Sequence, residues 1–251
     1  MSSNSFQYVS WFKDLFQKLG FTLSKDTAGL DFGCGVGQCV DQFRKAGYNM
    51  FGCDIDIPDN RDDRLKSYLE SGIIRKIGSD PYHIPFEDDT FDFIYSNVVF
   101  EHVMDYPSTL AELHRILKRD GMSVHTMPGR WTFKENHIYV PLASVIKTYG
   151  WLYFWAWWGI RNEYQQGLSA AQTAEINYRY LHQQTNYLSR RKIRKYVTQY
   201  FNDCRFVEDP YFCVPPKLSG LSQRFPLLLK IYRIWFSETK MRVLIFRKKK
   251  C

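Results

Sequence analysis

The stretch LDFGCGVGQ, residues 30–38, decides the fold, because a buried apolar segment runs there into three glycines at alternate positions. Glycine lets the backbone approach a ligand closely, and the helix expected next presents free N–H groups at its first turn. A dinucleotide-binding turn would place its third glycine at position 38, but Gln38 stands there. Asp31, two residues before the first glycine, suits a ligand ammonium better than a pyrophosphate. The turn therefore predicts a ligand site other than a dinucleotide site.

Outward from this turn, short apolar segments alternate with amphipathic ones along the first half of the chain. Five strands are predicted, at 28–32, 50–53, 73–77, 91–95 and 122–127. Helical patterns are expected at 6–19, from about 38 to 47, at 60–72 and at 107–121. Regular alternation of strands and helices favours a parallel sheet with helices on both faces.

After Pro128 this alternation stops. The sequence becomes aromatic, basic and mostly helical in pattern, with a helix expected at 189–201 and extended segments at 205–214 and 241–247. We expect one α/β domain over 1–251 rather than two independent domains. Its parts would be a cofactor-binding core at 21–128, a helical insertion or acceptor lid at 129–200, and closing strands with a basic tail at 201–251.

The charge of the chain is unevenly distributed. Its 251 residues carry a formal net charge of +8, yet residues 1–125 hold 13 Lys and Arg against 19 Asp and Glu. Residues 126–251 hold 21 Lys and Arg against 7 Asp and Glu. With 45% hydrophobic residues the chain is not predominantly disordered. We interpret the asymmetry as a cofactor half that uses carboxylates and an acceptor half with basic surfaces.

Metal, secretion and membrane-spanning signals are weak in this sequence. None of the six cysteines forms a C-x-x-C pair or lies at metal-ligand spacing from a histidine, so no metal is expected. No basic region followed by an apolar run opens the sequence, and we expect a cytoplasmic location. The longest apolar stretch, residues 151–160, is half of the roughly 20 residues that a membrane span needs.

The first half of the chain resembles the class I S-adenosylmethionine-dependent methyltransferases, broadly the subgroup that contains the ubiquinone- and menaquinone-type enzymes. The resemblance covers roughly residues 27–128. It is carried by LDFGCGVGQ, FGCDID, GSDPYHIPFEDDTFDFIYSNVVFEH and LAELHRILKRDGMSVHTMPG. It implies a Rossmann-like, seven-stranded, mainly parallel sheet whose last two strands close an antiparallel edge, with a helical, aromatic-rich insertion after the fifth strand.

The resemblance also implies S-adenosylmethionine as cofactor and S-adenosylhomocysteine as product. Asp31 and the backbone at Gly33, Cys34, Gly35 and Gly37 would hold the methionine part. Farther along the chain, Asp54 would hold the ribose, Ile55 would pack on the adenine, Asp80 would bond the adenine amino group with Tyr82 nearby, and Ser96 and Asn97 would line the sulfonium side.

Methyl transfer to a hydroxyl needs a group that accepts the proton. The candidates are Glu101, His102, His125, Glu135 and His137. His102 follows the fourth strand, at the edge of the sheet where ligands bind, and His137 lies in the loop after the fifth strand. We select His102 and His137 as candidate catalytic residues, with pocket lining and a surface loop as their respective alternatives. His125 lies inside a strand and is expected to be an interior residue.

The hypothesis is methyl transfer to a hydroxyl of a small or lipid-linked acceptor, such as a sugar or glycolipid. The aromatic run at 149–160 and the basic run at 190–195 suit such an acceptor or a peripheral contact with a membrane surface. A packed lid and a solvated helix are the simpler interpretations. Other functions left open are C- or N-methylation of a hydrophobic small molecule, a non-catalytic cofactor-binding partner, and a nucleic-acid methyltransferase. The [DNS]-P-P-[YFW] stretch of base-amino methyltransferases is absent after the fourth strand, which makes nucleic acid an unfavoured partner.

Overall fold

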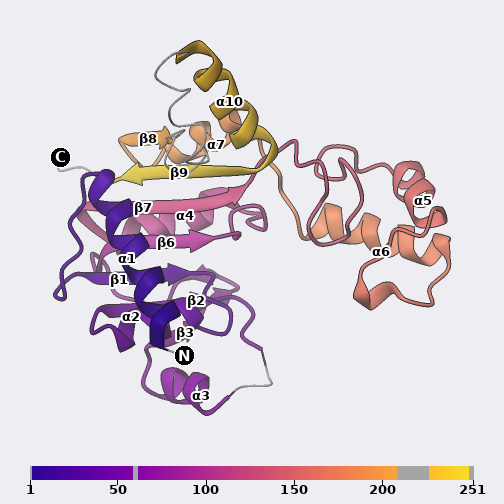
Figure 1. Ribbon diagram of the computed structural model, residues 1–251. Helices are drawn as coiled ribbons and strands as arrows, with labels where there is room; N and C mark the ends of the chain where they lie inside the picture. The colour runs from indigo at the N-terminus through magenta and orange to yellow at the C-terminus, as the bar shows by residue number, and fades with distance from the viewer. Residues whose placement is uncertain (1, 59–61, 208–225, 249–251) are drawn as a thin grey trace.

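The structure is a computed structural model that describes residues 2–58, 62–207 and 226–248. Its main sheet has seven strands in the order β3-β2-β1-β6-β7-β9-β8 (Figure 1). These strands are β1 (Ala28–Phe32), β2 (Asn49–Asp54), β3 (Ile74–Lys76), β6 (Phe91–Asn97), β7 (Leu117–Pro128), β8 (Asp203–Phe206) and β9 (Met241–Arg247). The first five are parallel, while β9 pairs antiparallel with both β7 and β8. The seven-stranded, mainly parallel sheet with an antiparallel edge is confirmed.

Helices cover both faces of this sheet, as predicted. One apolar layer packs α1 (Ser2–Lys18), α2 (Gln38–Lys45) and α3 (Asp63–Glu70) against inward side chains such as Phe93 and Tyr95. The opposite layer packs α4 (Tyr106–Ile116) and α7 (Arg190–Val197) against Leu30, Phe32 and Ile94. Successive residues of one strand thus enter opposite layers, since side chains of a strand alternate between faces.

Several predicted boundaries differ from the structure. The helix expected up to Gly121 ends at Ile116, because Leu117 already pairs with Phe91 as the first residue of β7. The helix expected at 189–201 is the shorter α7. The strand expected at 205–214 begins at Asp203 and ends at Phe206, and residues 208–214 lie outside the described part of the chain. A short hairpin of β4 (Gly78–Ser79) and β5 (Tyr82–His83) follows β3.

The insertion after β7 forms an arm that projects beyond the carboxyl ends of the parallel strands (Figure 1). It holds α5 (Tyr149–Trp157), the 3-10 turn η1 (Glu163–Gln165) and α6 (Ala170–Gln183). The arm has an apolar core of its own, made of Ile138, Val140, Ala143, Leu152, Ala174 and Leu181. The last described helix, α10 (Pro226–Thr239), leads into β9.

The chain returns from the arm at residues 184–188 and is tied to the loop that follows β6. The backbone N–H of Asn186 donates to the carbonyl of Glu101 at 2.6 Å, and its side-chain amide donates to the carbonyl of Val103 at 3.0 Å. His102 Nδ1 donates to the carbonyl of Gln184 at 2.8 Å. These bonds fix the base of the arm against the carboxyl end of β6. Within the described residues, no helix is long and apolar enough to cross a membrane.

Candidate active site

The glycine turn between β1 and α2 is held by the carboxylate that ends β2. The Gly35 N–H donates to Asp54 Oδ2 at 2.7 Å, and the backbone N–H of Asp56 donates to Asp54 Oδ1 at 3.1 Å. Gly35 has a φ of 50°, and a Cβ atom built on it would meet no other atom within 4 Å. A left-handed glycine beside open space leaves the backbone accessible to a ligand.

A polar cavity of about 380 Å³ lies on one side of this turn. Asp31 and Asn97 line it together with Gly33, Cys34, Gly35, Val36, Gln38, Cys39, Gln42 and Tyr95. Asp31 is only 5% exposed, and its burial, reinforced by the nearby charge of Asp54, raises the pKa of its carboxyl to about 7. A buried carboxylate in a polar cavity is a site for a cationic group, whose charge would favour the ionised form.

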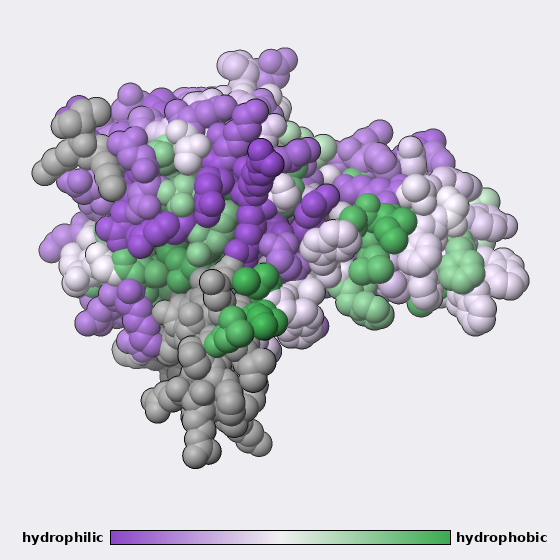
Figure 2. Space-filling model, turned by 90° about the horizontal axis from the view of Figure 1, so that it is seen from above, coloured by the Kyte–Doolittle hydropathy of each residue, from purple (hydrophilic) through white to green (hydrophobic). Residues whose placement is uncertain are grey.

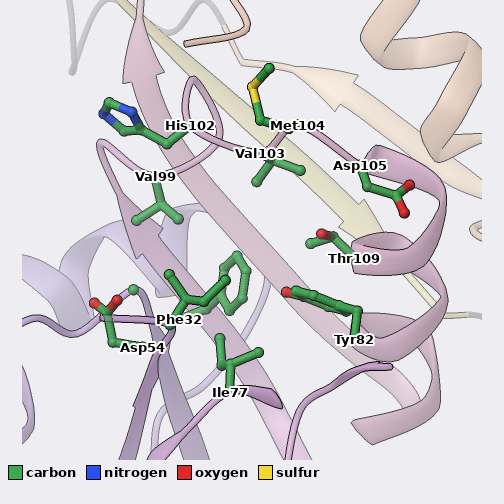
Figure 3. Close-up of a pocket in the computed structure, with 12 residues that line it drawn as sticks. Phe32, Asp54, Ile77, Tyr82, Val99, His102, Val103, Met104, Asp105 and Thr109 are labelled. Atoms are coloured by element: carbon green, nitrogen blue, oxygen red, sulfur yellow. The ribbon is translucent and has the colours of Figure 1, made fainter. Parts of the chain in front are cut away.

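A second cavity, of about 270 Å³, lies on the other side of the turn and also touches Gly33 (Figure 3). Its lining is mostly apolar, with Asp54 and Ile55 at the end of β2 and Tyr82 on β5. Phe32, Ile77, Val99, His102, Val103, Met104, Asp105 and Thr109 complete it. Because Gly33 lines both cavities, they adjoin at one backbone segment and suit the two ends of one elongated ligand.

Three predicted cofactor residues lie apart from these cavities. Ser96 is fully buried, and its hydroxyl shares a hydrogen bond of 2.7 Å with His125 Nδ1, because side chains alternate along β6 and that of Ser96 enters the sheet interior. Asp80 is exposed in the turn between β4 and β5 and does not line the second cavity. Asp105, which was not predicted, lines that cavity together with Tyr82. Gly37 is required by packing, since a Cβ there would lie 2.4 Å from Ile74 Cδ1.

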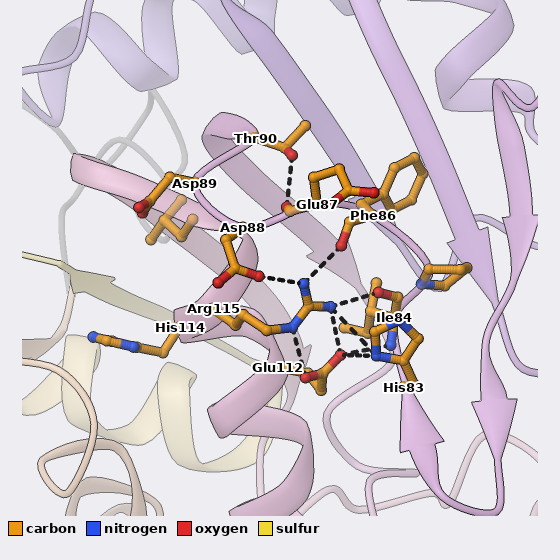
Figure 4. Close-up of polar contacts among 12 residues, drawn as sticks. His83, Ile84, Phe86, Glu87, Asp88, Asp89, Thr90, Glu112, His114 and Arg115 are labelled. Carbon is orange, nitrogen blue, oxygen red and sulfur yellow. Dashed lines mark hydrogen bonds and ion pairs between the residues drawn. The ribbon is translucent and has the colours of Figure 1, made fainter.

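The wall of the second cavity is anchored by an arginine on α4 (Figure 4). Arg115 binds both carboxylate oxygens of Glu112, at 2.8 and 2.7 Å, and Asp88 at 2.9 Å. It also donates to the carbonyls of Ile84 and Phe86, each at 2.7 Å. Glu112 in turn accepts the N–H of Ile84 at 2.8 Å. The network fixes to α4 the segment that follows β5, the short strand that carries Tyr82.

The two candidate catalytic histidines meet where the arm joins the sheet. Their ring centroids lie 4.9 Å apart, with the planes at 83°. His102 lines the second cavity, and burial lowers the pKa of its imidazole. His137 Nδ1 lies 2.8 Å from Glu135 Oε1, and this hydrogen bond raises the pKa of His137. A histidine that donates Nδ1–H to a carboxylate keeps Nε2 as its proton acceptor.

The carboxylate of Glu135 is held from several directions. It is fully enclosed, and besides His137 it accepts the hydroxyl of Tyr187 at 2.6 Å and the backbone N–H of Ile138 at 2.8 Å. Burial alone would raise the pKa of Glu135, but the hydrogen bonds from His137, Tyr187 and Ile138 bring it below its usual value. Tyr187, which sequence reasoning missed, lies 52 residues from its partner, and no motif marks it.

Glu101 is a second buried carboxyl beside these residues. It is 3% exposed, and within the described part of the chain neither of its side-chain oxygens has a hydrogen-bond partner. Burial raises its pKa to about 7. His102 Nε2 lies 4.0 Å from Glu101 Oε1. The remaining candidate, His125, is buried inside the sheet between Ser96 and Ser123, and burial holds its pKa well below the usual value. His125 is thus an interior residue, as expected.

The described residues hold no group of three or more His, Cys, Asp or Glu that could bind a metal ion. The cysteines at positions 34, 39, 53 and 204 form no disulfide within the described residues.

Comparison with known proteins places the site in a family. The family model of a methyltransferase domain matches residues 30–124. The mitochondrial arginine-hydroxylase NDUFAF5 of Mus musculus is 33% identical over 117 residues, which are 46% of this chain and 33% of that protein. The demethylmenaquinone methyltransferase of Staphylococcus aureus (strain Newman) is 31% identical over 120 residues, or 47% of this chain and 49% of that protein. The chain thus spans a third to a half of these curated relatives.

Among solved structures, the phosphoethanolamine N-methyltransferase 2 of Haemonchus contortus in complex with S-adenosyl-L-methionine shares the fold. Its TM-score is 0.52 at 13% identity, covering 95% of this chain and 52% of that chain. The family model covers the part of the chain that contains the glycine turn and the lining of both cavities, and its match ends before the arm begins. By its sheet order and by the family-model match over residues 30–124, this half of the chain is a class I S-adenosylmethionine-dependent methyltransferase domain.

Proposed function

We propose that this protein transfers a methyl group from S-adenosylmethionine to a hydroxyl of a small or lipid-linked acceptor, such as a sugar or glycolipid. The observation that carries the hydroxyl assignment is the His137–Glu135 pair, at 2.8 Å, beside His102 at the edge of the cofactor cavity. An alcohol must lose its proton when its oxygen is methylated, and a histidine paired with a buried carboxylate can accept it.

The two cavities fit the proposed cofactor. Asp31 would pair with its ammonium, the open backbone at Gly35 would face its methionine part, and Asp54 would accept hydrogen bonds from its ribose hydroxyls. Ile55 and Tyr82 would enclose the adenine in the apolar cavity. When bound, the cofactor supplies a methyl carbon that is already activated by positive sulfur, so that the protein contributes mainly positioning.

His137 is the proposed proton acceptor. Glu135 orients its ring through Nδ1 and stabilises the imidazolium that forms, and Tyr187 and the Ile138 N–H hold Glu135 in place. His102 lines the cavity with its ring against His137. Its Nδ1–H donates to the carbonyl of Gln184, so that Nε2 is the unprotonated nitrogen of the neutral ring. Both histidines are proposed to face the acceptor, with His137 taking the proton and His102 orienting the hydroxyl.

The test of this function is a methylation screen. Purified protein and S-adenosylmethionine labelled in the methyl group are incubated with polar and lipid fractions of a cell extract, and labelled products are identified by mass spectrometry. An O-methylated product that disappears with His137→Ala supports the proposal. A product methylated on nitrogen or carbon would replace the hydroxyl assignment, and cofactor binding without any turnover would indicate a regulatory role.

A control separates the cofactor site from the base. Asp31→Asn should weaken cofactor binding about tenfold or more, because the ammonium loses a buried charged partner. His137→Ala should bind the cofactor as the unmodified protein does and should lose about a hundredfold in turnover, the usual contribution of a general base. Equal loss of cofactor affinity in both variants would contradict the separate roles.

A further inference from the structure

The outer face of α5 is a surface that the proposed reaction does not use. Tyr149, Tyr153 and Trp157 recur along it at every fourth residue, with Phe154 and Trp158 beside them. Trp157 and Trp158 are 67% and 66% exposed, so most of each side chain is in contact with solvent. Residues on this spacing lie on one side of a helix. The structure thus presents an aromatic stripe to solvent.

This stripe is not an unfinished part of the arm's own core. The opposite side of α5 already packs through Leu152 and Ala156, which are fully buried, against α6 and the loop before α5. Trp151 and Trp155 flank that contact, and Trp151 Nε1 donates to the carbonyl of Pro141 at 2.8 Å. In Figure 1, α5 lies at the outer end of the arm, away from the sheet. Within the stripe, Tyr149 also donates its hydroxyl to the carbonyl of Ala171 on α6 at 3.4 Å, whereas Trp157 and Trp158 at its other end stay largely exposed in the folded arm.

The residue types of the stripe fit one kind of partner. Residues 149–160 include no Asp, Glu, Lys or Arg, and the outward side chains are tryptophan, tyrosine and phenylalanine rather than aliphatic. Tryptophan and tyrosine have an apolar ring and a polar edge, which suits them to the boundary between lipid headgroups and acyl chains. In Figure 2 pale and green residues gather along one edge of the projecting arm.

The charge of the insertion favours a negatively charged lipid surface. Residues 129–200 hold ten Lys and Arg against three Asp and Glu. Five of the ten lie at 190–195 on α7, which packs against α4 and β8 on the body of the molecule, and Arg191, Lys192, Arg194 and Lys195 there are exposed. Exposed basic residues attract anionic headgroups and add to the binding that an apolar contact provides elsewhere on the molecule. Aromatic contact and positive charge together distinguish this surface from an interface with a second copy of the same basic chain.

We propose that the arm docks on an anionic lipid bilayer, with the α5 stripe of Tyr149, Tyr153, Phe154, Trp157 and Trp158 entering the headgroup region. Docking would bring the base of the arm, where His137 and Tyr187 lie, close to lipid-linked acceptors. The docking surface does not depend on methyl transfer, because its residues line neither cavity.

Vesicle flotation tests the proposal with no cofactor or acceptor present, so that its failure would leave the proposed reaction untouched. The full chain should float with vesicles of phosphatidylcholine and phosphatidylglycerol, and less with phosphatidylcholine alone. The double variant W157A/W158A should bind at least about tenfold more weakly. Trp11→Ala, which removes an exposed tryptophan on α1, is the matched control and should bind as the unmodified chain does.

Two further measurements guard against a variant that folds poorly. Tryptophan fluorescence of the unmodified protein should be quenched by vesicles that contain brominated lipid, because the stripe enters the bilayer. R191E/K192E should weaken binding to the anionic vesicles. Absence of binding and quenching, or equal binding by W157A/W158A, would overturn the proposal. So would sedimentation showing that the stripe instead holds two copies of the chain together.

Discussion

At Asp31 the protein keeps a carboxyl group nearly out of contact with water, beside an open polar cavity. Its pKa is raised to about 7 by burial and by Asp54, so the group is largely neutral in mildly acidic solution. A ligand ammonium favours the charged form and lowers this pKa, so binding should release a proton from the neutral fraction.

The first prediction follows from this titration. The affinity for S-adenosylmethionine should rise with pH up to about pH 7, by roughly tenfold per pH unit well below it, because only the ionised Asp31 pairs with the ammonium. Calorimetry at several pH values measures the effect, and Asp31→Asn should give a weaker but nearly flat profile. A profile that is identical in the two proteins would exclude Asp31 as the titrating group.

His137 gives the second prediction. Its hydrogen bond to Glu135 raises its pKa above the usual 6.5, and it can accept a proton only when it is neutral. Turnover should therefore fall as pH drops through that raised pKa. Glu135→Gln removes the charge that favours the imidazolium, so the midpoint of this decline should move to lower pH while the maximal rate decreases. A midpoint that stays in place would contradict the His137–Glu135 pairing.

Among the elements, the contact between the arm and the loop after β6 contains Glu101, a carboxyl without a hydrogen-bond partner among the described residues. Its pKa is about 7 in the folded protein, against an ordinary value of 4.5. A carboxyl whose pKa is higher in the folded than in the unfolded protein stabilises the folded state at low pH. That stabilisation is lost as pH rises from the pKa of the unfolded state to the pKa of the folded state.

The third prediction is a pH-dependent stability. Between about pH 5 and pH 8 the free energy of unfolding should fall by on the order of 3 kcal/mol through Glu101, since one pKa unit corresponds to about 1.4 kcal/mol. Urea unfolding of Glu101→Gln should lack this part of the decline. If the variant and the unmodified protein lose stability in parallel, Glu101 is not the group that titrates.

The segment between β5 and β6 supplies the fourth prediction. Arg115→Ala removes two carboxylate contacts and two bonds to backbone carbonyls, and it leaves Glu112 partly buried without its arginine. We expect a loss of about 2–4 kcal/mol in unfolding free energy and weaker cofactor binding, because the released segment directly follows Tyr82 on β5. Arg119→Ala, an exposed neighbour, should change little. Unchanged cofactor affinity in Arg115→Ala would show that the segment holds its place without the network.

Across the whole molecule, local sequence was sufficient to predict the strands and the glycine turn of the first half, while its cofactor contacts stay predictions. The glycine turn, Asp31, Asp54 and Ile55 lie at strand ends, and strand ends can be found from a run of apolar residues that stops. The side chain of Ser96 points to the face of the sheet where His125 is buried. The motif alone did not show which residues of the strand point to which face. The extent of β7 was underestimated for a similar reason, since its first residue, Leu117, pairs with Phe91, which is distant in the sequence.

The arm could not be read from the sequence in the same way. Its polar cluster joins Glu135 to Tyr187 across 52 residues, and such a contact follows from the path of the chain rather than from spacing. The aromatic run at 149–160 predicted a helix rich in large side chains but gave no means of telling the packed side from the exposed one. The division of the charge into an acidic cofactor half and a basic acceptor half stays a prediction.

The central claim is that the cofactor lies across the glycine turn, and Gly35 tests it most directly. Asparagine tolerates a positive φ, and a Cβ at this position meets nothing within 4 Å, so Gly35→Asn should fold normally and obstruct only a ligand. Gly167→Asn is the matched control, with a φ of 81° and equally open space. Calorimetry with S-adenosylmethionine should show binding to the unmodified chain and to Gly167→Asn, and none to Gly35→Asn. Equal affinity in all three proteins would contradict this placement of the cofactor.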